Sequence, residues 1–403
     1  MTEKNKFNVV VVGGGTAGIT TAARLLRVGV KDIAIVEPSE VHYYQPLWTL
    51  VGGGLVKQST TLRAMAKVMP DKAAWIKDRA IGADPESNSF ALANGREISY
   101  DWAVVAPGIQ LNFNKIPGLE EAVGKDVVSS NYRFDLAPKT WENIKATTSG
   151  TAIFNMPTGA IKCAGAPQKI AYLAADYWQR KGVLDKIRIV LVLPGPGIFG
   201  VPEFAKPLLE VVKRYNIEVR YSSEIVSVDG PNRRVQIKNL ANPDAPLEEM
   251  SYDFAHFVPP QSAPDWIRES KLADTANPAG YVEVDKNSLQ HVRYPNVFAI
   301  GDAGSTPNSK TGAAIRKQAP VVVSQMTYAM GIQSGKPKQY DGYASCPLVT
   351  SHNRCIMAEF DYKPQPTPTF PVLNMQKERW DMFMVKRYGL PAMYWNAMLK
   401  GLA

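Results

Sequence analysis

The stretch NVVVVGGGTAG, residues 8–18, decides the fold. Its valine run predicts a fully buried parallel strand, because such strands are apolar on both faces. A helical pattern follows three glycines with G-x-G-x-x-G spacing, Gly13, Gly15 and Gly18. In a dinucleotide-binding unit these glycines allow a tight turn, close approach of the pyrophosphate and packing of the helix. We therefore predict a Rossmann-type nucleotide site here, with Thr16 as a further contact.

A ribose-binding acid follows at the required distance. The next predicted strand, residues 32–36, ends at Glu37, which is 19 residues past Gly18. The order of these elements is that of a dinucleotide-binding unit: strand, glycines, helix, strand and acid. A glycine turn that binds no ligand is therefore the less favoured interpretation.

Two later segments favour FAD over NAD at this site. Residues 294–302, YPNVFAIGD, read as a strand ending at Asp302, typical of the chain return in two-dinucleotide flavoproteins. A helix is predicted just after Lys310, and its positive end would stabilise a reduced flavin. Residues 100–108, YDWAVVAPG, resemble the segment that closes the same domain at Gly108. FAD is the predicted cofactor.

A second Rossmann-like unit is predicted without a nicotinamide site. A strand at 151–155 is followed by a loop that carries Cys163 instead of spaced glycines, and then by a helix at about 167–181. The next strand, 187–193, ends in a proline where a ribose-binding acid would be expected. A second glycine set at 195–200 lies among prolines and precedes no acid-terminated strand, so we favour a tight turn beside the active site.

Three cysteines are too few for a disulfide framework. Each is then either a buried small hydrophobe or one member of a pair with a redox role. Cys163 follows Lys162 and precedes a helix whose first turn holds Lys169; both the ammonium groups and the helix end favour the thiolate. Cys346 lies in a non-periodic segment far along the chain. Cys355 lies on an apparent strand and is interpreted as a buried small hydrophobe.

These segments together resemble the sulfide:quinone oxidoreductases, most closely the branch that includes the mitochondrial enzyme, and the likeness runs nearly end to end. The motifs are VGGG at 12–15, VEPSE at 36–40 with YQPL at 44–47, KCAGAPQK at 162–169, YPNVF at 294–298 with GD at 301–302, and YDGY at 340–343 with SCPLVT at 345–350. The resemblance implies a membrane-associated flavoprotein that oxidises hydrogen sulfide to sulfane sulfur and passes two electrons to a quinone.

By the same resemblance, Cys163 and Cys346 are the redox pair. Sulfide attacks their disulfide, or a sulfur-bridged form of it, and leaves a persulfide on one cysteine while the other thiolate engages the flavin. The implied FAD contacts are Glu37 at the adenosine ribose, Gln45 along the FAD, Ala80 at the adenine, and Asp302 and Lys310 beside the flavin. His352 and Cys355 depart from the family pattern, and no role is assigned to either.

The chain of 403 residues, 45% of them hydrophobic, has room for two or three domains. The predicted fold class is α/β, with two Rossmann-like dinucleotide-binding domains of the FAD/NAD(P)-linked reductase type and a C-terminal membrane-associating helical segment. The expected domains are a discontinuous FAD domain at 1–115 and 285–340, a second domain at 116–284, and a C-terminal region at 341–403.

The net charge of +9 is spread along the chain, which suits an anionic membrane surface and shows no nucleic-acid module. No metal is predicted. The chain opens directly into a strand without an apolar signal region, so we expect a cytoplasmic protein without a signal peptide. A helix that spans a bilayer needs about 18 consecutive apolar residues, and no run in the sequence reaches that length.

The C-terminus predicts an anchor on the membrane surface. After a proline-rich linker at 363–371, two helical patterns at 376–388 and 391–400 are separated by Gly389. Both are rich in aromatic residues and methionine, with interspersed basic residues, namely Arg379, Lys386, Arg387 and Lys400. We expect a monotopic protein on the cytoplasmic side; the alternative is that these helices cover the core or form a dimer contact, and a homo-oligomer stays possible.

Two other functions stay open. One is a single-subunit NADH:quinone oxidoreductase, against which the missing glycine loop counts. The other is a flavin-based sulfide or redox sensor without turnover. The sequence does not identify the quinone, nor whether a small thiol accepts the sulfur.

Overall fold

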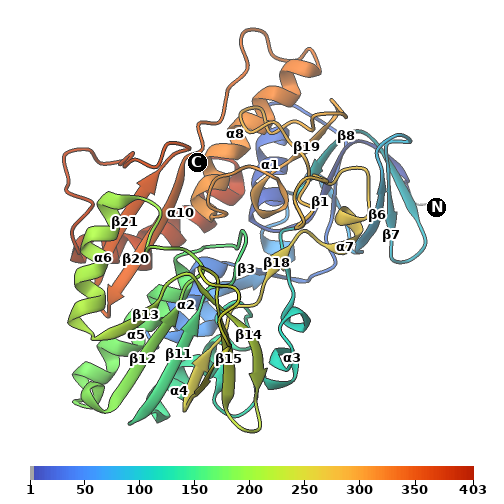
Figure 1. The fold of residues 1–403 in the computed structure, drawn as a ribbon. Coiled ribbons are helices and arrows are strands. Elements are labelled where there is room, and N and C mark those ends of the chain that lie inside the picture. The colour runs from blue at the N-terminus through green and yellow to red at the C-terminus, as the bar shows by residue number, and fades with distance from the viewer. Residues whose placement is uncertain (1–3) are drawn as a thin grey trace.

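The computed structural model describes residues 4–403 and contains two Rossmann-like sheets (Figure 1). The first has the order β5-β2-β1-β8-β7-β6, with β19 added beside β8. Its strands are β1 Lys6–Val12, β2 Ile33–Val36, β5 Ala73–Ile76, β6 Ala80–Asp84, β7 Ser89–Leu92, β8 Glu97–Val105 and β19 Val297–Ala299. β19 pairs in parallel with β8, so the chain returns to its first sheet at the predicted segment.

The valine-rich strand β1 lies at the centre of this sheet because it is apolar on both faces. Residues Val9, Val10 and Val11 are fully buried. The glycines after β1 lead into α1, Thr16–Arg27, which packs beside α8, Gly312–Ala329 (Figure 1). The carboxyl ends of β1 and β2 therefore meet the start of α1, which is where such sheets bind ligands.

The second sheet is parallel, with the order β10-β17-β11-β12-β13. Its strands are β10 Val128–Ser129, β11 Gly150–Asn155, β12 Ile187–Val192, β13 Ile217–Arg220 and β17 Phe254–His256. Its helices are α4 Ala137–Ala146, α5 Ala166–Arg180 and α6 Pro202–Arg214. An antiparallel sheet of β14 Ser223–Asp229, β15 Arg234–Asn239 and β16 Glu248–Ser251 follows β13. The predicted mixed α/β fold with two Rossmann-like units is confirmed.

Shorter elements join the two sheets. They are β3 Val41–Tyr43, α2 Trp48–Gly52, β4 Leu62–Ala64, β9 Gln110–Leu111, α3 Leu119–Ala122, β18 Gln261–Ser262 and α7 Asp265–Arg268. A hairpin of β20, Ala344–Ser351, and β21, Arg354–Phe360, then packs against α5.

The C-terminal segment is helical, but not as two separate helices. α9, Trp380–Met384, passes through a π-helical turn, Val385–Gly389, into α10, Leu390–Asn396. The expected break at Gly389 is wrong: this residue has helical φ −65° and ψ −51°. Pro391 lacks an N–H and cannot donate the usual helical hydrogen bond. The π turn before it lets the helix continue without that hydrogen bond.

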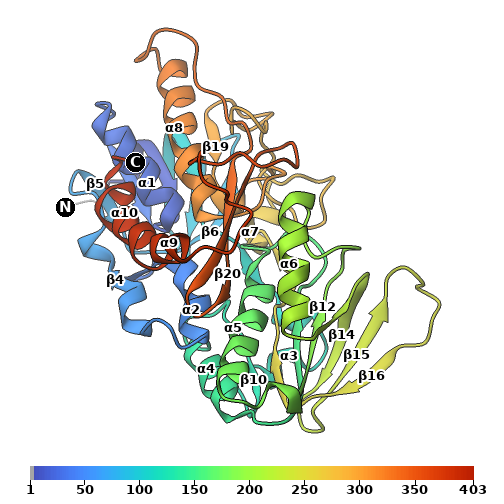
Figure 2. The same cartoon turned by 90° about the vertical axis from the view of Figure 1, so that its left-hand side faces the viewer.

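This segment lies beside α1 and α2 (Figure 2). Its inner side chains are buried, namely Met382, Phe383, Tyr394, Trp395, Met398 and Leu399. A large part of the aromatic and methionine content therefore covers the core. Within residues 4–403, no helix is both long and apolar enough to cross a bilayer.

Candidate active site

Two cysteines that lie 183 positions apart share one lysine. Cys163 lies in the loop between β11 and α5, and Cys346 lies on β20, which packs against α5. Lys169, in the first turn of α5, places its Nζ 3.1 Å from Cys163 Sγ and 4.0 Å from Cys346 Sγ. Lys169 and Cys346 are buried and Cys163 is half-buried, so the predicted pair forms a largely enclosed cluster of two sulfur atoms and one ammonium.

The two thiols have opposite pKa shifts. The pKa of Cys163 lies well below its usual value, because Cys346 hydrogen-bonds to it and the Lys169 ammonium lies beside it. The pKa of Cys346 lies well above its usual value, because it donates that hydrogen bond and is buried. The reduced pair therefore loses one proton readily, from Cys163, and keeps the other.

Cys163 has a strained backbone held by its neighbours. Its φ is +49°, in the left-handed region that non-glycine residues seldom adopt. Its N–H donates to the carbonyl oxygen of Lys310 at 2.9 Å, and its own carbonyl accepts from the hydroxyl of Tyr132 at 3.1 Å. Such strain persists only where surrounding contacts impose it, and here those contacts fix the sulfur at the site.

Lys386 is a second buried lysine at this cluster, and its predicted place on a membrane-facing helix surface is wrong. It was expected among the basic residues of a membrane-facing helix, but it is 3% exposed and its Nζ donates to the carbonyl of Pro46 at 2.9 Å. Burial lowers its pKa to about 8, the Lys169 ammonium lowers it further, and the charges of the three cysteines oppose both effects. The available signal was spacing: Lys386 follows the buried Met382 and Phe383 by four and three residues, which puts it on their face.

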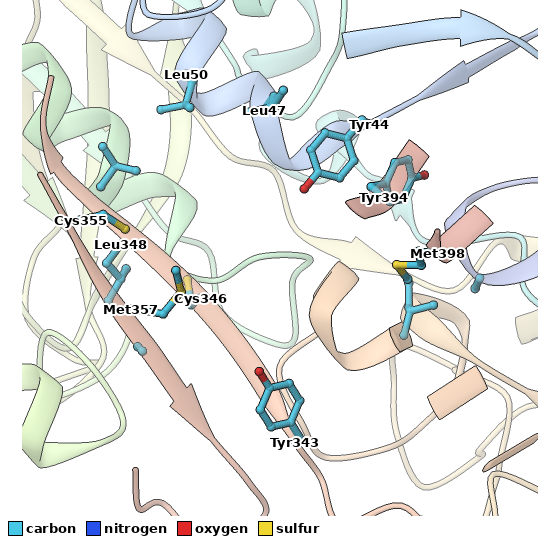
Figure 3. Packing of buried hydrophobic residues seen from close by; sticks show 14 of the residues in the cluster. Tyr44, Leu47, Leu50, Tyr343, Cys346, Leu348, Cys355, Met357, Tyr394 and Met398 are labelled. Carbon is cyan, nitrogen blue, oxygen red and sulfur yellow. The ribbon is translucent and has the colours of Figure 1, made fainter. Parts of the chain in front are cut away.

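Two other residues of the hairpin, Cys355 and His352, make hydrogen bonds to groups outside the sulfur pair. Figure 3 shows Cys346 and Cys355 along the hairpin with Leu348 and Met357. Cys355 is fully buried, and burial raises its pKa to about 12, so its thiol stays protonated. His352 lies at the hairpin turn, where its Nδ1 is 3.2 Å from the Asp176 carboxylate.

The turn after β1 fits a dinucleotide pyrophosphate. A Cβ on Gly13, whose φ is +103°, would lie 2.3 Å from the carbonyl oxygen of Ala106, and one on Gly18 would lie 1.8 Å from that of Gly13. A Cβ on Gly15 would meet no atom within 4 Å. No side chain caps the start of α1, so its first N–H groups are available to an anion.

Glu37 fits the predicted ribose contact. It follows β2 and lies beside the turn, where its two carboxylate oxygens accept from the N–H groups of Gly14 and Ser39, each at 2.7 Å. Burial raises the pKa of this carboxyl, and the two amides oppose that shift. Each oxygen retains lone pairs for a ribose hydroxyl.

Two further predicted contacts, Lys310 and Asp302, lie beside the loop that carries Cys163, because the backbone of Lys310 pairs with that of Lys162. Lys310 donates to the carbonyls of Asp302 and Gly304 at 2.9 and 2.8 Å, and its Nζ lies 3.7 Å from the ring centroid of Tyr281. Burial raises the pKa of Asp302 and lowers that of Lys310 to about 8.

Gln45 accepts a 2.8 Å hydrogen bond from the Nζ of Lys162, the residue before Cys163. Gly108 follows β8 with φ +84° and no atom within 4 Å of a Cβ placed on it. Ala80 begins β6 at the edge of the first sheet. Their roles in FAD binding stay predictions.

Comparison with known proteins identifies the family of this chain. The pattern of the pyridine nucleotide-disulphide oxidoreductase family matches residues 7–319. The mitochondrial sulfide:quinone oxidoreductase of Mus musculus is 42% identical over 402 residues, covering 99% of this chain and 88% of that protein. The chain belongs to the sulfide:quinone oxidoreductase family. The Dictyostelium discoideum member is 39% identical, covering 99% of this chain and 87% of its own.

The fold is also that of a solved family member. The sulfide:quinone oxidoreductase of Aquifex aeolicus superposes with a TM-score of 0.82 at 20% identity, over 98% of this chain and 92% of its own. As members of this flavoprotein family bind FAD, the predicted cofactor is confirmed. In the present chain, the second glycine set at residues 195–200 forms a loop that lies on α5. There the side-chain amide of Gln168 donates a hydrogen bond to the carbonyl of Ile198.

Proposed function

We propose that this protein oxidises hydrogen sulfide to sulfane sulfur and delivers two electrons to a quinone, with Cys163 and Cys346 as the redox pair. The observation that carries this proposal is the shared Lys169 ammonium, which lies within 4.0 Å of both sulfur atoms. Disulfide exchange needs two sulfur atoms in reach of each other and one stabilised thiolate, and this cluster supplies both.

The reaction begins from the disulfide of the pair. Hydrosulfide attacks one sulfur atom, so the bond between the cysteines breaks, a new sulfur–sulfur bond forms, and the other cysteine leaves as a thiolate. A small thiolate then takes the outer sulfur and leaves two reduced cysteines. Bound FAD supplies the two-electron path by which the pair is returned to the disulfide and the quinone is reduced to the quinol.

We propose, from the directions of the two pKa shifts, that Cys346 carries the persulfide. The thiol with the lower pKa is the better leaving group in exchange, and that thiol is Cys163. Attack on the sulfur of Cys346 expels the Cys163 thiolate next to Lys169. A Cβ at Gly165 would lie 2.5 Å from Cys346 Sγ, so a residue without a side chain is needed at this position for the sulfur to pack there.

The residues proposed to hold FAD follow from the fit of the turn. Gly13, Gly15, Gly18 and the backbone of Thr16 receive the pyrophosphate, and Glu37 the ribose. The further contacts proposed are Gln45, Ala80, Gly108, Asp302 and Lys310. The division into an FAD domain at 1–115 and 285–340, a Cys163 domain at 116–284 and a region at 341–403 is part of this proposal.

Sulfide alone is expected to bleach the flavin absorption of the purified protein without oxygen, and a soluble quinone to restore it. NADH alone is expected to leave the flavin oxidised, since the loop after β11 carries Cys163 where a nicotinamide site needs glycines. Bleaching by NADH instead of sulfide would contradict the proposal. Bleaching by sulfide that no quinone reverses would favour a sensor.

We propose further that the C-terminal region binds a membrane surface through side chains that the core leaves exposed. Trp380 and Tyr388 are each 55% exposed, and Val372, just after the proline-rich linker, is 92% exposed. Aromatic residues next to basic ones suit the interface of a bilayer. The comparisons give no support to a cytoplasmic side, since the similar eukaryotic proteins carry "mitochondrial" in their names.

Replacing both Trp380 and Tyr388 with serine is expected to weaken vesicle binding by about tenfold or more, because each loses an interfacial ring. The measurement is co-sedimentation with vesicles containing anionic lipid. Leu247→Ser, an exposed apolar change near the antiparallel sheet, is the control and should bind as the parent does. Equal binding by all three proteins would place the anchor elsewhere. Deleting residues 378–403 is a poorer test, because it would uncover the core.

A further inference from the structure

A buried hydrogen-bonded ring joins the C-terminal segment to the dinucleotide turn. The hydroxyl of Tyr394, on α10, lies 2.8 Å from Thr16 Oγ1 and 2.6 Å from His42 Nε2. His42 Nδ1 lies 3.0 Å from the carbonyl oxygen of Gly14. The ring therefore starts and ends on the turn between β1 and α1, although Tyr394 follows Thr16 by 378 positions.

The hydrogens in this ring have one consistent arrangement. The Gly14 carbonyl only accepts, so His42 Nδ1 carries the proton and Nε2 accepts from Tyr394. The phenol has then used its proton, so it accepts from the hydroxyl of Thr16. Burial keeps the imidazole neutral by lowering the pKa of His42 to about 4.

This arrangement leaves Thr16 only its backbone N–H for an anion. Its hydroxyl proton is committed to Tyr394, and its N–H lies at the uncapped start of α1. The carbonyl of Gly14 is held by His42 Nδ1. Both contacts orient the peptide groups of the turn without occupying the space around Gly15.

The surrounding rings hold Tyr394 in place. The ring centroid of Tyr44 lies 4.4 Å and that of Trp395 4.9 Å from the ring of Tyr394, and the Arg63 guanidinium lies 4.5 Å from the ring of Trp395. Tyr394 is 3% exposed and His42 is 2% exposed. A rigid, dry environment strengthens such a network and makes the loss of one member costly.

We infer that Tyr394 and His42 form a latch that holds the Gly14–Thr16 turn in its FAD-binding shape, so that the C-terminal segment is part of the cofactor site. The latch rests on FAD binding at the turn, as the proposed function does, but not on the cysteine chemistry. Tyr394 is a positioning residue in this proposal: it acts through Thr16 and His42. Loosening the segment would then release FAD.

Tyr394→Phe removes one oxygen atom and is expected to speed FAD release about tenfold, which corresponds to about 1.4 kcal/mol of lost hydrogen bonding. The measurement is the rise of free-flavin fluorescence after dilution. The variant should also lower the Tm of the FAD-loaded protein more than that of the apoprotein. Tyr328→Phe, at an exposed position on α8, is the control and should release FAD at the parent rate.

A second variant separates the latch from simple packing. His42→Leu should also speed FAD release, and the double variant should release FAD no faster than the quicker single one, because both break the same ring. Parental release by Tyr394→Phe, or effects that multiply in the double variant, would overturn the proposal. The FAD-release measurement needs no turnover, so it tests the latch whether or not the protein oxidises sulfide. A flavin that sulfide does not bleach would refute the proposed activity alone.

Discussion

Replacing Cys163 with serine is expected to lower sulfide-dependent quinone reduction by at least about a thousandfold. A serine hydroxyl forms neither the disulfide that sulfide attacks nor a thiolate beside Lys169. Cys346→Ser should fail to the same extent, because exchange needs both sulfur atoms. Initial rates of quinone reduction, expressed per bound flavin, measure the loss.

The matched control is Cys355→Ala. Cys355 is buried on the same hairpin, but its high pKa keeps it protonated and no step requires it. This variant should retain the activity of the parent protein. Near-normal turnover in either serine variant would refute the assignment of the redox pair.

Replacing Lys169 with methionine is expected to lower kcat/KM at neutral pH by about ten- to a hundredfold. Methionine has a similar length but no charge, so the pKa of Cys163 should rise. The hydrogen bond from Cys346 is the larger cause of the low pKa and remains, so part of the thiolate should survive.

The pH dependence distinguishes this effect from a packing defect. The thiolate of Cys163 forms in the reduced pair as the pH rises through its pKa. A raised pKa should therefore move the pH profile of kcat, which includes reoxidation of the pair, towards alkaline pH and restore part of the rate there. The pH dependence of Cys163 alkylation in the reduced protein should move in the same direction. Lys181→Met, at the exposed end of α5, is the control; an unmoved profile in Lys169→Met would contradict the role of the ammonium.

The sequence predicted those features of the fold that depend on local pattern. The valine run, the glycine spacing and Glu37 all lie within about 30 residues, and the structure has β1, α1 and β2 at these positions. The return strand β19 was predictable because its own pattern, ending at Asp302, marks it. The pairing of Cys163 with Cys346 was supplied by family resemblance, since no local spacing relates residues on different sheets.

Contacts between distant segments explain what the sequence analysis missed. The charge of Lys386 indicated a surface position, whereas its helical spacing from Phe383 indicated the buried face. The spacing was the correct indication. The contact of Tyr394 with His42 depends on how the C-terminal segment packs on α1, which no periodicity encodes. The uninterrupted helix at Gly389 depends on a π turn, a response to Pro391 that helix propensity does not indicate.

The positions of the cysteines also govern the topology of the chain. A bond between Cys163 and Cys346 would close a covalent ring of 184 residues, nearly half of the polypeptide. By chain-entropy arguments, closing so long a loop disfavours the unfolded state by about 5 kcal/mol. Every turnover would open and reclose this ring, so the resting oxidised protein would carry a restraint against unfolding that its reduced form gives up.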